Sequence, residues 1–385
     1  MAAHYIGLMS GTSLDGADGV LVRFAGPNER LEVLATAGES FSAKFKAELL
    51  ALNTSGVDEL HRAALAASEL AQIYARLVHR LHADAAQVLG VPAAVAAIGA
   101  HGQTVRHRPD GHAGQPYSGY TLQLNNPALL AELTGCTVVA DFRSRDVAAG
   151  GQGAPLVPAF HQQLFGRLGA DVWVLNIGGM ANLSIVPATE RVHENVLGFD
   201  CGPGNCLMDA WCRQHTGQHF DNNGNWAATG RSIPALLDKL LAEPYLNAPP
   251  PKSTGRDLFS TDWLARHLAP FAQAHPADIQ YTLTELTAQA CCRSLAAYQR
   301  ASQDQQKTLI VCGGGAFNQH LMSRLQAGLP GVAVLPSSDY GLGPLQVEAA
   351  AFAWLARQTM QRRPGNIPSV TGATGARVLG AIYPA

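Results

Sequence analysis

One arrangement of strands and turns occurs twice in this chain of 385 residues. Each copy has three short runs of apolar and β-branched residues separated by polar or glycine-rich turns, a pattern typical of an antiparallel meander. The predicted strands are residues 5–10, 19–24 and 31–37 in the first copy and residues 172–177, 183–186 and 196–199 in the second. Predicted helices follow both copies, at 57–89 and 205–215. The repetition indicates an α/β fold built from two related lobes.

The composition agrees with two compact domains. Hydrophobic residues make up 47% of the chain and charged residues only 15%, against roughly 25% in average proteins, which disfavours disorder and coiled coils. A single core rarely grows beyond about 250–300 residues, so the length predicts two domains. We expect the C-terminal tail to return to the first lobe, which gives a first lobe of 1–140 plus about 358–385 and a second lobe of 141–357.

Charge, termini and cysteines limit the partners and the compartment. The net charge is -2 and no dense Lys/Arg run occurs, so we expect no nucleic-acid binding. The chain begins without a signal-peptide pattern and has no apolar stretch of about 20 residues, so we expect no membrane insertion. Seven cysteines without a CxxC pair favour a cytoplasmic protein without structural metal. The adjacent Cys291 and Cys292 are interpreted as core residues.

The first of three glycine turns links the first two predicted strands. Glycine, serine and threonine expose backbone N–H groups and hydroxyls, which suits a phosphate-binding loop. The turn lacks the GxxxxGK[ST] pattern, so it is not a P-loop. An ordinary hairpin loop is the alternative, because the same residues are common in turns. The candidate ATP-binding residues are Gly11, Thr12, Ser13, Leu14, Asp15, Gly16, Ala17 and Asp18.

Two further glycine turns follow apolar strands in the second half. In the second turn, adjacent glycines would allow a phosphoryl oxygen to approach the backbone, although a simple Gly-Gly hairpin is equally compatible. The third turn leads into a predicted helix whose N-terminus would offer free N–H groups, and its glycines would leave a flat surface for adenine. The candidate ATP-binding residues are Asn176, Gly178, Gly179 and Asn182 in the second turn and Gly313, Gly314, Gly315 and Asn318 in the third.

Several longer blocks have distinctive amino-acid sequences. They are Gly7-Leu8-Met9-Ser10-Gly11-Thr12-Ser13-Leu14-Asp15-Gly16, His101-Gly102-Gln103-Thr104, Ala140-Asp141-Phe142-Arg143, Gly150 to Pro158, Gly198-Phe199-Asp200-Cys201-Gly202-Pro203-Gly204-Asn205 and Pro251-Lys252-Ser253-Thr254-Gly255-Arg256. With these blocks the chain resembles the anhydro-N-acetylmuramic acid kinase family, within the actin-like, sugar kinase and Hsp70 superfamily. Asn125 and an extended loop at 110–118 depart from the family pattern. The resemblance implies a two-lobed actin-like ATPase fold with duplicated RNase H-like units and a central nucleotide cleft.

The resemblance also implies a reaction. The family uses ATP and water to open a 1,6-anhydro amino sugar released in cell-wall recycling and to phosphorylate its O6. Its general base corresponds to Asp200, which ends an apolar strand; the alternative from the residues alone is a helix-capping Asp. Mg²⁺ is expected, with Asp15 and Asp18 acting through water because Mg²⁺ loses its hydration shell reluctantly.

Four residues are candidates for sugar binding. His101 and Gln103 follow a predicted buried strand, and a buried loop histidine is the alternative for His101. Arg145 suits the lactyl carboxylate of a muramic acid, and a surface ion pair with Asp146 is its alternative. Glu348 lies in an apolar helix, where an acidic residue is costly to bury without a function. Lys252 and Arg256 are left unassigned.

Two other functions are compatible with the same fold. In another phosphotransferase, a substrate hydroxyl or carboxylate would attack ATP directly and Asp200 would deprotonate the substrate. A non-catalytic nucleotide switch would require a peptide- or DNA-binding module, for which the chain leaves no room. The expected partners are therefore small molecules, namely the sugar, ATP and water, and a homodimer is left open.

Overall fold

The chain divides into two compact units. The computed structural model describes residues 3–11, 14–26, 30–112, 115, 117–166, 168, 170–188, 196–250, 252–255, 258–299 and 307–385. Unit 1 consists of Met1–Leu164 and Leu345–Ala385, and unit 2 consists of Phe165–Pro344. Each unit contains its own sheet and its own hydrophobic core.

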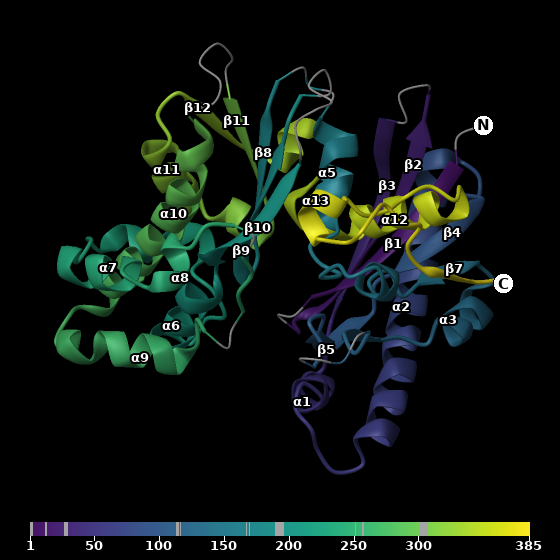
Figure 1. The fold of residues 1–385 in the computed structure, drawn as a ribbon, viewed down its shortest axis with the longest axis horizontal. Helices are drawn as coiled ribbons and strands as arrows, with labels where there is room; N and C mark the ends of the chain where they lie inside the picture. The colour runs from purple at the N-terminus through teal and green to yellow at the C-terminus, as the bar shows by residue number, and fades with distance from the viewer. Residues whose placement is uncertain are drawn as a thin grey trace. The chain divides into compact units, whose positions relative to one another are not determined.

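Unit 1 is built on a six-stranded sheet (Figure 1). Its strands are β1 (Ala3–Ser10), β2 (Gly16–Ala25), β3 (Arg30–Ser40), β4 (Val95–Ala100), β7 (Val138–Ala140) and β13 (Ala381–Tyr383), in the order β13-β7-β4-β1-β2-β3. The first three strands are antiparallel, whereas β4 runs parallel to β1 and β7 parallel to β4. A separate hairpin consists of β5 (Gln103–Arg108) and β6 (Tyr120–Leu124).

The sheet of unit 2 repeats this topology. Its strands are β8 (Val172–Ile177), β9 (Met180–Val186), β10 (Leu197–Pro203), β11 (Lys307–Cys312) and β12 (Val332–Pro336), in the order β10-β9-β8-β11-β12. Again three antiparallel strands come first and two parallel strands follow on the other side of the first strand. The predicted α/β class and the predicted duplication are therefore confirmed.

Helices cover both faces of the unit 1 sheet. They are α1 (Ala43–Ala51), α2 (Glu59–Leu89), α3 (Pro127–Thr134), α4 (Ser144–Ala148), α5 (Val157–Phe165), α12 (Val347–Met360) and α13 (Pro368–Thr371). A Cβ atom on Gly7 of β1 would collide with the Ala349 carbonyl oxygen, so only glycine lets α12 pack this closely. Gly19 of β2 faces Leu81 of α2 instead. Because Gly19 is paired with Leu8, the residue after Gly7, α2 and α12 lie on opposite faces.

The helices of unit 2 surround a core of leucine and aromatic residues. They are α6 (Cys206–Thr216), α7 (Pro234–Leu241), α8 (Pro244–Asn247), α9 (Thr261–Leu268), α10 (Pro276–Gln299) and α11 (Gln319–Gly328). Short 3-10 turns occur at η1 (Asn222–Gly224), η2 (Ala227–Thr229), η3 (Ala269–Phe271), η4 (Gly314–Phe317), η5 (Ser337–Tyr340) and η6 (Pro344–Gln346). Cys291 of α10 is buried and Cys292 is half-buried beside the core, as expected of core residues.

The limits of the units differ from those expected from the sequence. The expected boundaries are 140 and 357, but the contacts place them after Leu164 and after Pro344. The difference arises because α12 packs on β1 and β4, which belong to the first sheet. The C-terminal tail joins unit 1 as expected, since β13 pairs with β7. Within the described residues, no helix is both long and apolar enough to cross a membrane.

Candidate active site

The second glycine turn and the start of α6 are hydrogen-bonded to each other in unit 2. The N–H of Asn205 donates to the Gly178 carbonyl at 2.8 Å, and the N–H of Gly204 donates to the Gly179 carbonyl at 3.0 Å. A Cβ atom on Gly204 would collide with the Gly178 carbonyl oxygen. Glycine at position 204 therefore allows two backbone segments to meet at the end of β8.

The third glycine turn joins the same place. Gly313 follows β11, which runs parallel to β8, so both strands end at the same edge of the sheet. Gly313 has a φ of 77°, and a Cβ atom there would lie 2.5 Å from Asn176 Oδ1 and 2.6 Å from the Ile177 carbonyl oxygen. Asn205 Nδ2 donates to that Ile177 oxygen at 3.0 Å. The second and third turns thus form one surface rich in backbone groups at the carboxyl ends of parallel strands, where α/β proteins bind ligands.

Gly313→Ala is expected to weaken nucleotide binding by about five- to 150-fold. The new methyl group would require a strained backbone and would push against β8, at a cost of about 1–3 kcal/mol. Isothermal titration with an ATP analogue measures the affinity. Gly331→Ala is the matched control, because Gly331 has a φ of 79° and a methyl group there would meet no atom within 4 Å. Equal affinities of the two variants would contradict the assignment of this turn.

The three asparagines predicted near the nucleotide have different environments. Asn176, Asn182 and Asp200 occupy neighbouring register positions across β8, β9 and β10. Asn182 therefore lies beside the predicted base, on the same side of the sheet. In contrast, Asn318 caps α11, where its Oδ1 accepts from the Leu321 N–H at 2.9 Å. The Asn318 side chain thus stabilises a helix, and its proposed nucleotide contact has no support from this geometry.

Asp200 lies in β10 and does not cap α6, whose N-cap position is Asn205. Its Oδ2 accepts a hydrogen bond from the Thr254 N–H at 3.0 Å. Burial raises the pKa of Asp200 to about 6, while the Thr254 hydrogen bond and the Lys252 charge oppose this rise. A carboxylate with this pKa is mostly ionised at neutral pH and is a stronger base than an ordinary aspartate, as general-base catalysis requires.

The first glycine turn belongs to unit 1. Thr12 and Ser13 lie outside the described residues. Leu14 is buried with a φ of 58°, and its N–H donates to the Gly11 carbonyl at 3.2 Å. Gly16 and Ala17 already belong to β2, and a Cβ atom on Gly16 would collide with the Glu39 carbonyl oxygen. The Asp15 carboxylate is exposed and forms an ion pair with Lys46 at 2.7 Å.

Asp18, Glu348 and Arg143 interact electrostatically in unit 1. Glu348 lies in the first turn of α12, where burial raises its pKa; the Arg143 charge lowers it and the Asp18 charge raises it again. Asp18 keeps solvent contact, but the protein atoms around it partly desolvate its carboxylate and raise its pKa. The Asp18 charge disfavours the charge on Glu348, and a divalent cation bound beside the two carboxylates would relieve this repulsion. The described residues contain no group of three or more ligands for a metal.

The His101 side chain accepts hydrogen bonds from the Arg143 guanidinium. Arg143 Nε and Nη2 donate to His101 Nε2 at 3.1 and 3.0 Å, and Arg143 Nη1 donates to the Gly153 carbonyl at 2.7 Å. His101 is 4% exposed, and burial together with the Arg143 charge lowers its pKa to about 3. It is therefore neutral and accepts through Nε2. Burial lowers the Arg143 pKa to about 10, so the guanidinium stays charged at neutral pH.

In these contacts His101 holds Arg143 and Gln103 holds the first glycine turn, so we interpret both side chains as supports of the candidate site and not as part of its surface. Gln103 is fully buried, and its Nε2 donates to the Gly11 carbonyl at 3.2 Å, so it holds the first glycine turn. The buried-histidine alternative describes His101. Arg143 is the residue that the sequence did not identify as a candidate site residue, although it lies in one of the blocks with a distinctive amino-acid sequence. No local pattern signals its role, since its partners are distant in the chain.

Arg145 is exposed, and its alternative assignment as a partner of Asp146 does not hold. Asp146 is fully buried and accepts from the Gly153 N–H at 2.7 Å, Asn366 Nδ2 at 2.6 Å and Thr371 Oγ1 at 2.8 Å. This carboxylate ties the end of the chain to α4. Arg145 therefore remains available on the surface of unit 1.

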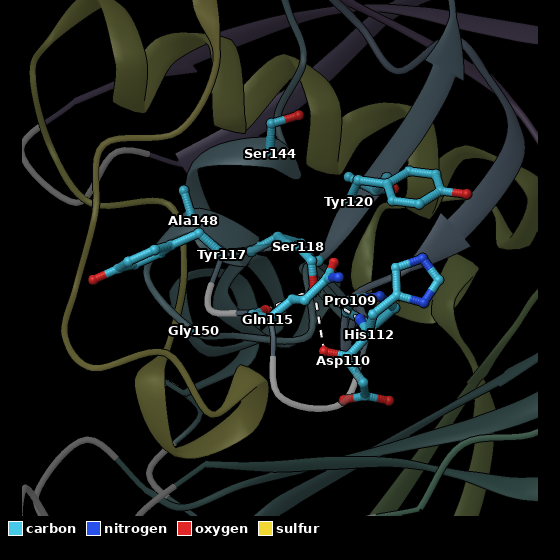
Figure 2. Close-up of a pocket in the computed structure, with 13 residues that line it drawn as sticks. Pro109, Asp110, His112, Gln115, Tyr117, Ser118, Tyr120, Ser144, Ala148 and Gly150 are labelled. Carbon is cyan, nitrogen blue, oxygen red and sulfur yellow. Dashed lines mark hydrogen bonds between the residues drawn. The ribbon is translucent and has the colours of Figure 1, made fainter.

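A cavity of about 750 Å³ lies in unit 1 next to the hairpin β5–β6 (Figure 2). The described part of the loop expected at 110–118 lines one side, and residues of α4 such as Ser144 line another. The Ser118 hydroxyl donates to the Gln115 carbonyl at 2.8 Å and accepts from the His112 N–H at 2.7 Å (Figure 2). None of the predicted site residues is among the described residues that line this cavity.

Comparison with known proteins identifies the family. A family model described as anhydro-N-acetylmuramic acid kinase matches residues 3–385. The anhydro-N-acetylmuramic acid kinase of Variovorax paradoxus (strain S110) is 61% identical over 383 residues, which cover 99% of each chain. That of Albidiferax ferrireducens is 58% identical over 401 residues and covers 100% of each. This chain therefore belongs to the anhydro-N-acetylmuramic acid kinase family.

Proposed function

We propose that the protein uses ATP and water to convert 1,6-anhydro-N-acetylmuramic acid into N-acetylmuramic acid 6-phosphate and ADP, a step in cell-wall recycling. Water forms a bond to the anomeric carbon while the bond from that carbon to O6 breaks. O6 then takes the γ-phosphoryl group of ATP. The observation that carries this proposal is the half-buried Asp200, whose pKa of about 6 suits a base that takes the proton of water.

The geometry around Asp200 supports its role as that base. Its Oδ2 is held by the Thr254 N–H, and its Oδ1 has no hydrogen-bond partner among the described residues. Oδ1 is then the oxygen that accepts the proton. The glycine turns of unit 2 lie at the same sheet edge and would bind phosphate through backbone N–H groups, and in unit 1 we assign the same role to the turn at 11–18.

Mg²⁺ fits Asp18 and Glu348 best. When bound, the ion would neutralise charge on the phosphates, as in other phosphoryl transfers. Asp15 would first have to leave its ion pair with Lys46. We reassign Glu348 from the sugar to the ion, propose Arg143 in its place for the sugar side of unit 1, and keep the exposed Arg145 as the candidate for the lactyl carboxylate. The expected cytoplasmic location stays a prediction.

Incubation in ¹⁸O-labelled water tests the hydrolytic step. We expect one labelled oxygen on the anomeric hydroxyl of the product and none in the new phosphate ester, because water attacks carbon and O6 comes from the substrate. Mass spectrometry of rapidly quenched product locates the label. Unlabelled product kept in the same water corrects for spontaneous exchange.

The same assay separates the competing functions. A kinase that transfers phosphate directly would leave the product unlabelled and would accept glucose or N-acetylglucosamine. A nucleotide switch would phosphorylate none of the three sugars. Either outcome would refute the proposed reaction.

A further inference from the structure

Two described stretches of the chain, residues 245–250 and 252–254, contact Asp200 at three points. The Asp200 N–H donates to the Lys252 carbonyl at 3.1 Å, and the Tyr245 hydroxyl donates to the Asp200 carbonyl at 3.0 Å. The third contact is the hydrogen bond from the Thr254 N–H to Oδ2 at 3.0 Å. Backbone and carboxylate of the proposed base are thus both held by these two stretches.

The Lys252 side chain connects these two stretches. Its Nζ donates to the carbonyls of Tyr245 at 3.3 Å and Leu246 at 3.2 Å, and it lies 5.0 Å from the centre of the Tyr245 ring. Both carbonyls belong to α8. Tyr245 and Thr254 each form a hydrogen bond with Asp200. Lys252 lies two residues before Thr254 and binds α8, which contains Tyr245. Its ammonium group therefore keeps both hydrogen bonds to Asp200 aligned.

We infer that Lys252 is a positioning residue for the proposed general base: it holds Thr254 against one carboxylate oxygen and leaves the other oxygen for water. This inference rests on the proposed function and extends it to a lysine that the sequence patterns leave unassigned. The role requires no contact of Lys252 with substrate or phosphate.

Charge effects agree with the geometry. Burial alone would push the Asp200 pKa higher, and the Lys252 charge lowers it. Burial lowers the pKa of Lys252, while the charges of Cys201 and Asp200 act in the opposite direction. The titratable groups that interact with this site in the described residues are Lys252, Tyr245 and Cys201. Lys252 is the cation among them, so its removal leaves the Asp200 charge uncompensated.

The pH dependence of kcat/KM separates positioning from a merely structural role. For the unchanged protein, activity should rise with pH through a midpoint near 6, where Asp200 loses its proton. In Lys252→Met the midpoint should move up by about one pH unit, so the loss is about fivefold larger at pH 6 than at pH 9. Lys252→Arg should keep the midpoint. Lys239→Met, an exposed lysine on α7, is the control.

A second measurement does not depend on activity. Difference infrared spectroscopy of the full-length protein against Asp200→Asn reports the carboxyl band of Asp200, and its titration midpoint should shift upward in Lys252→Met as well. Lys252→Gln replaces Lys252→Met if the latter does not fold. An unchanged infrared midpoint, or an equal loss of rate at every pH, would overturn the inference. If Asp200→Asn stayed active while the infrared midpoint shifted, Asp200 would not be the base, but the contact by which Lys252 orients and charges Asp200 would still be supported.

Discussion

Asp200→Asn is expected to reduce kcat by about 10³–10⁴-fold. General-base catalysis contributes roughly 10²–10⁴-fold to a rate, and the amide of asparagine cannot accept the proton of the attacking water. The hydrogen bond from the Thr254 N–H should survive, because the asparagine side-chain oxygen can replace Oδ2. A steady-state assay of ADP formation with 1,6-anhydro-N-acetylmuramic acid measures the loss.

Nucleotide affinity should change less than twofold in the same variant. The proposed phosphate contacts are backbone groups of the glycine turns and do not involve the Asp200 carboxylate. Isothermal titration with an ATP analogue checks this point, and Asp238→Asn on the exposed face of α7 is the matched control. Near-normal turnover of Asp200→Asn would move the base to another residue. Loss of both turnover and nucleotide binding would show that the change disrupts the fold locally.

The raised pKa of Asp200 also predicts a change in stability. The folded-state pKa of about 6 exceeds the unfolded value of about 3.9. The folded state therefore binds the proton of the Asp200 carboxyl group more tightly than the unfolded state does. The resulting contribution to the free energy of unfolding is fully present below about pH 4 and is lost as the pH rises through 6. Asp200→Asn should raise the free energy of unfolding by about 2 kcal/mol at pH 8, discounted for partial solvent contact. At pH 4 the gain should vanish. Urea titrations at both pH values measure it.

Arg143→Met is expected to reduce kcat/KM by about 10²–10³-fold and the free energy of unfolding by about 2–4 kcal/mol. Without the guanidinium, Glu348 keeps its desolvation but loses the charge that lowers its pKa, so its pKa rises further and its carboxylate is less suited to bind a cation. His101 Nε2 and the Gly153 carbonyl would also lose their donors. Steady-state kinetics at varied Mg²⁺ and urea unfolding measure the two effects.

Two further variants make this prediction specific. Arg145→Met removes an exposed cation two residues away and should change the free energy of unfolding by less than about 0.5 kcal/mol. Arg143→Met combined with Glu348→Gln should recover part of the lost stability, because the second change removes the uncompensated carboxylate. An Arg143→Met protein as stable as Arg145→Met would contradict the assignment of Arg143 to a buried charge cluster.

Much of the fold could be predicted because its signals are local. The alternation of apolar residues located the strands of both meanders, and their repetition indicated two units with the same topology. The boundary of unit 1 could not be predicted in this way. Helix α12 is apolar on nearly all sides, so its sequence does not show which sheet it packs on. In the structure its backbone approaches the glycines at 7 and 99 of the first sheet. The role of these glycines becomes visible only when the approaching backbone atoms are known.

One part of the candidate site could also be predicted from local sequence patterns, and another part could not. The apolar run before Asp200 and the glycine turns beside it are visible in the chain, because such runs and turns have short-range patterns. The strand itself continues to Pro203, so Asp200 lies within β10 and not at its end as expected. The charge cluster of unit 1 joins residues near positions 18, 101, 143 and 348, and no spacing rule connects them.

By itself, then, the sequence determined the two α/β units, the glycine turns and the family, and it pointed to Asp200 as the proposed base. Only the tertiary structure decided that Arg143, and not Arg145, lies with Glu348, that His101 supports this arginine, and that Tyr245, Lys252 and Thr254 hold Asp200. The physical reason is that pKa values and charge pairing depend on burial and on distances between side chains. Those quantities arise from the packing of distant segments, whereas strands and turns arise from neighbouring residues.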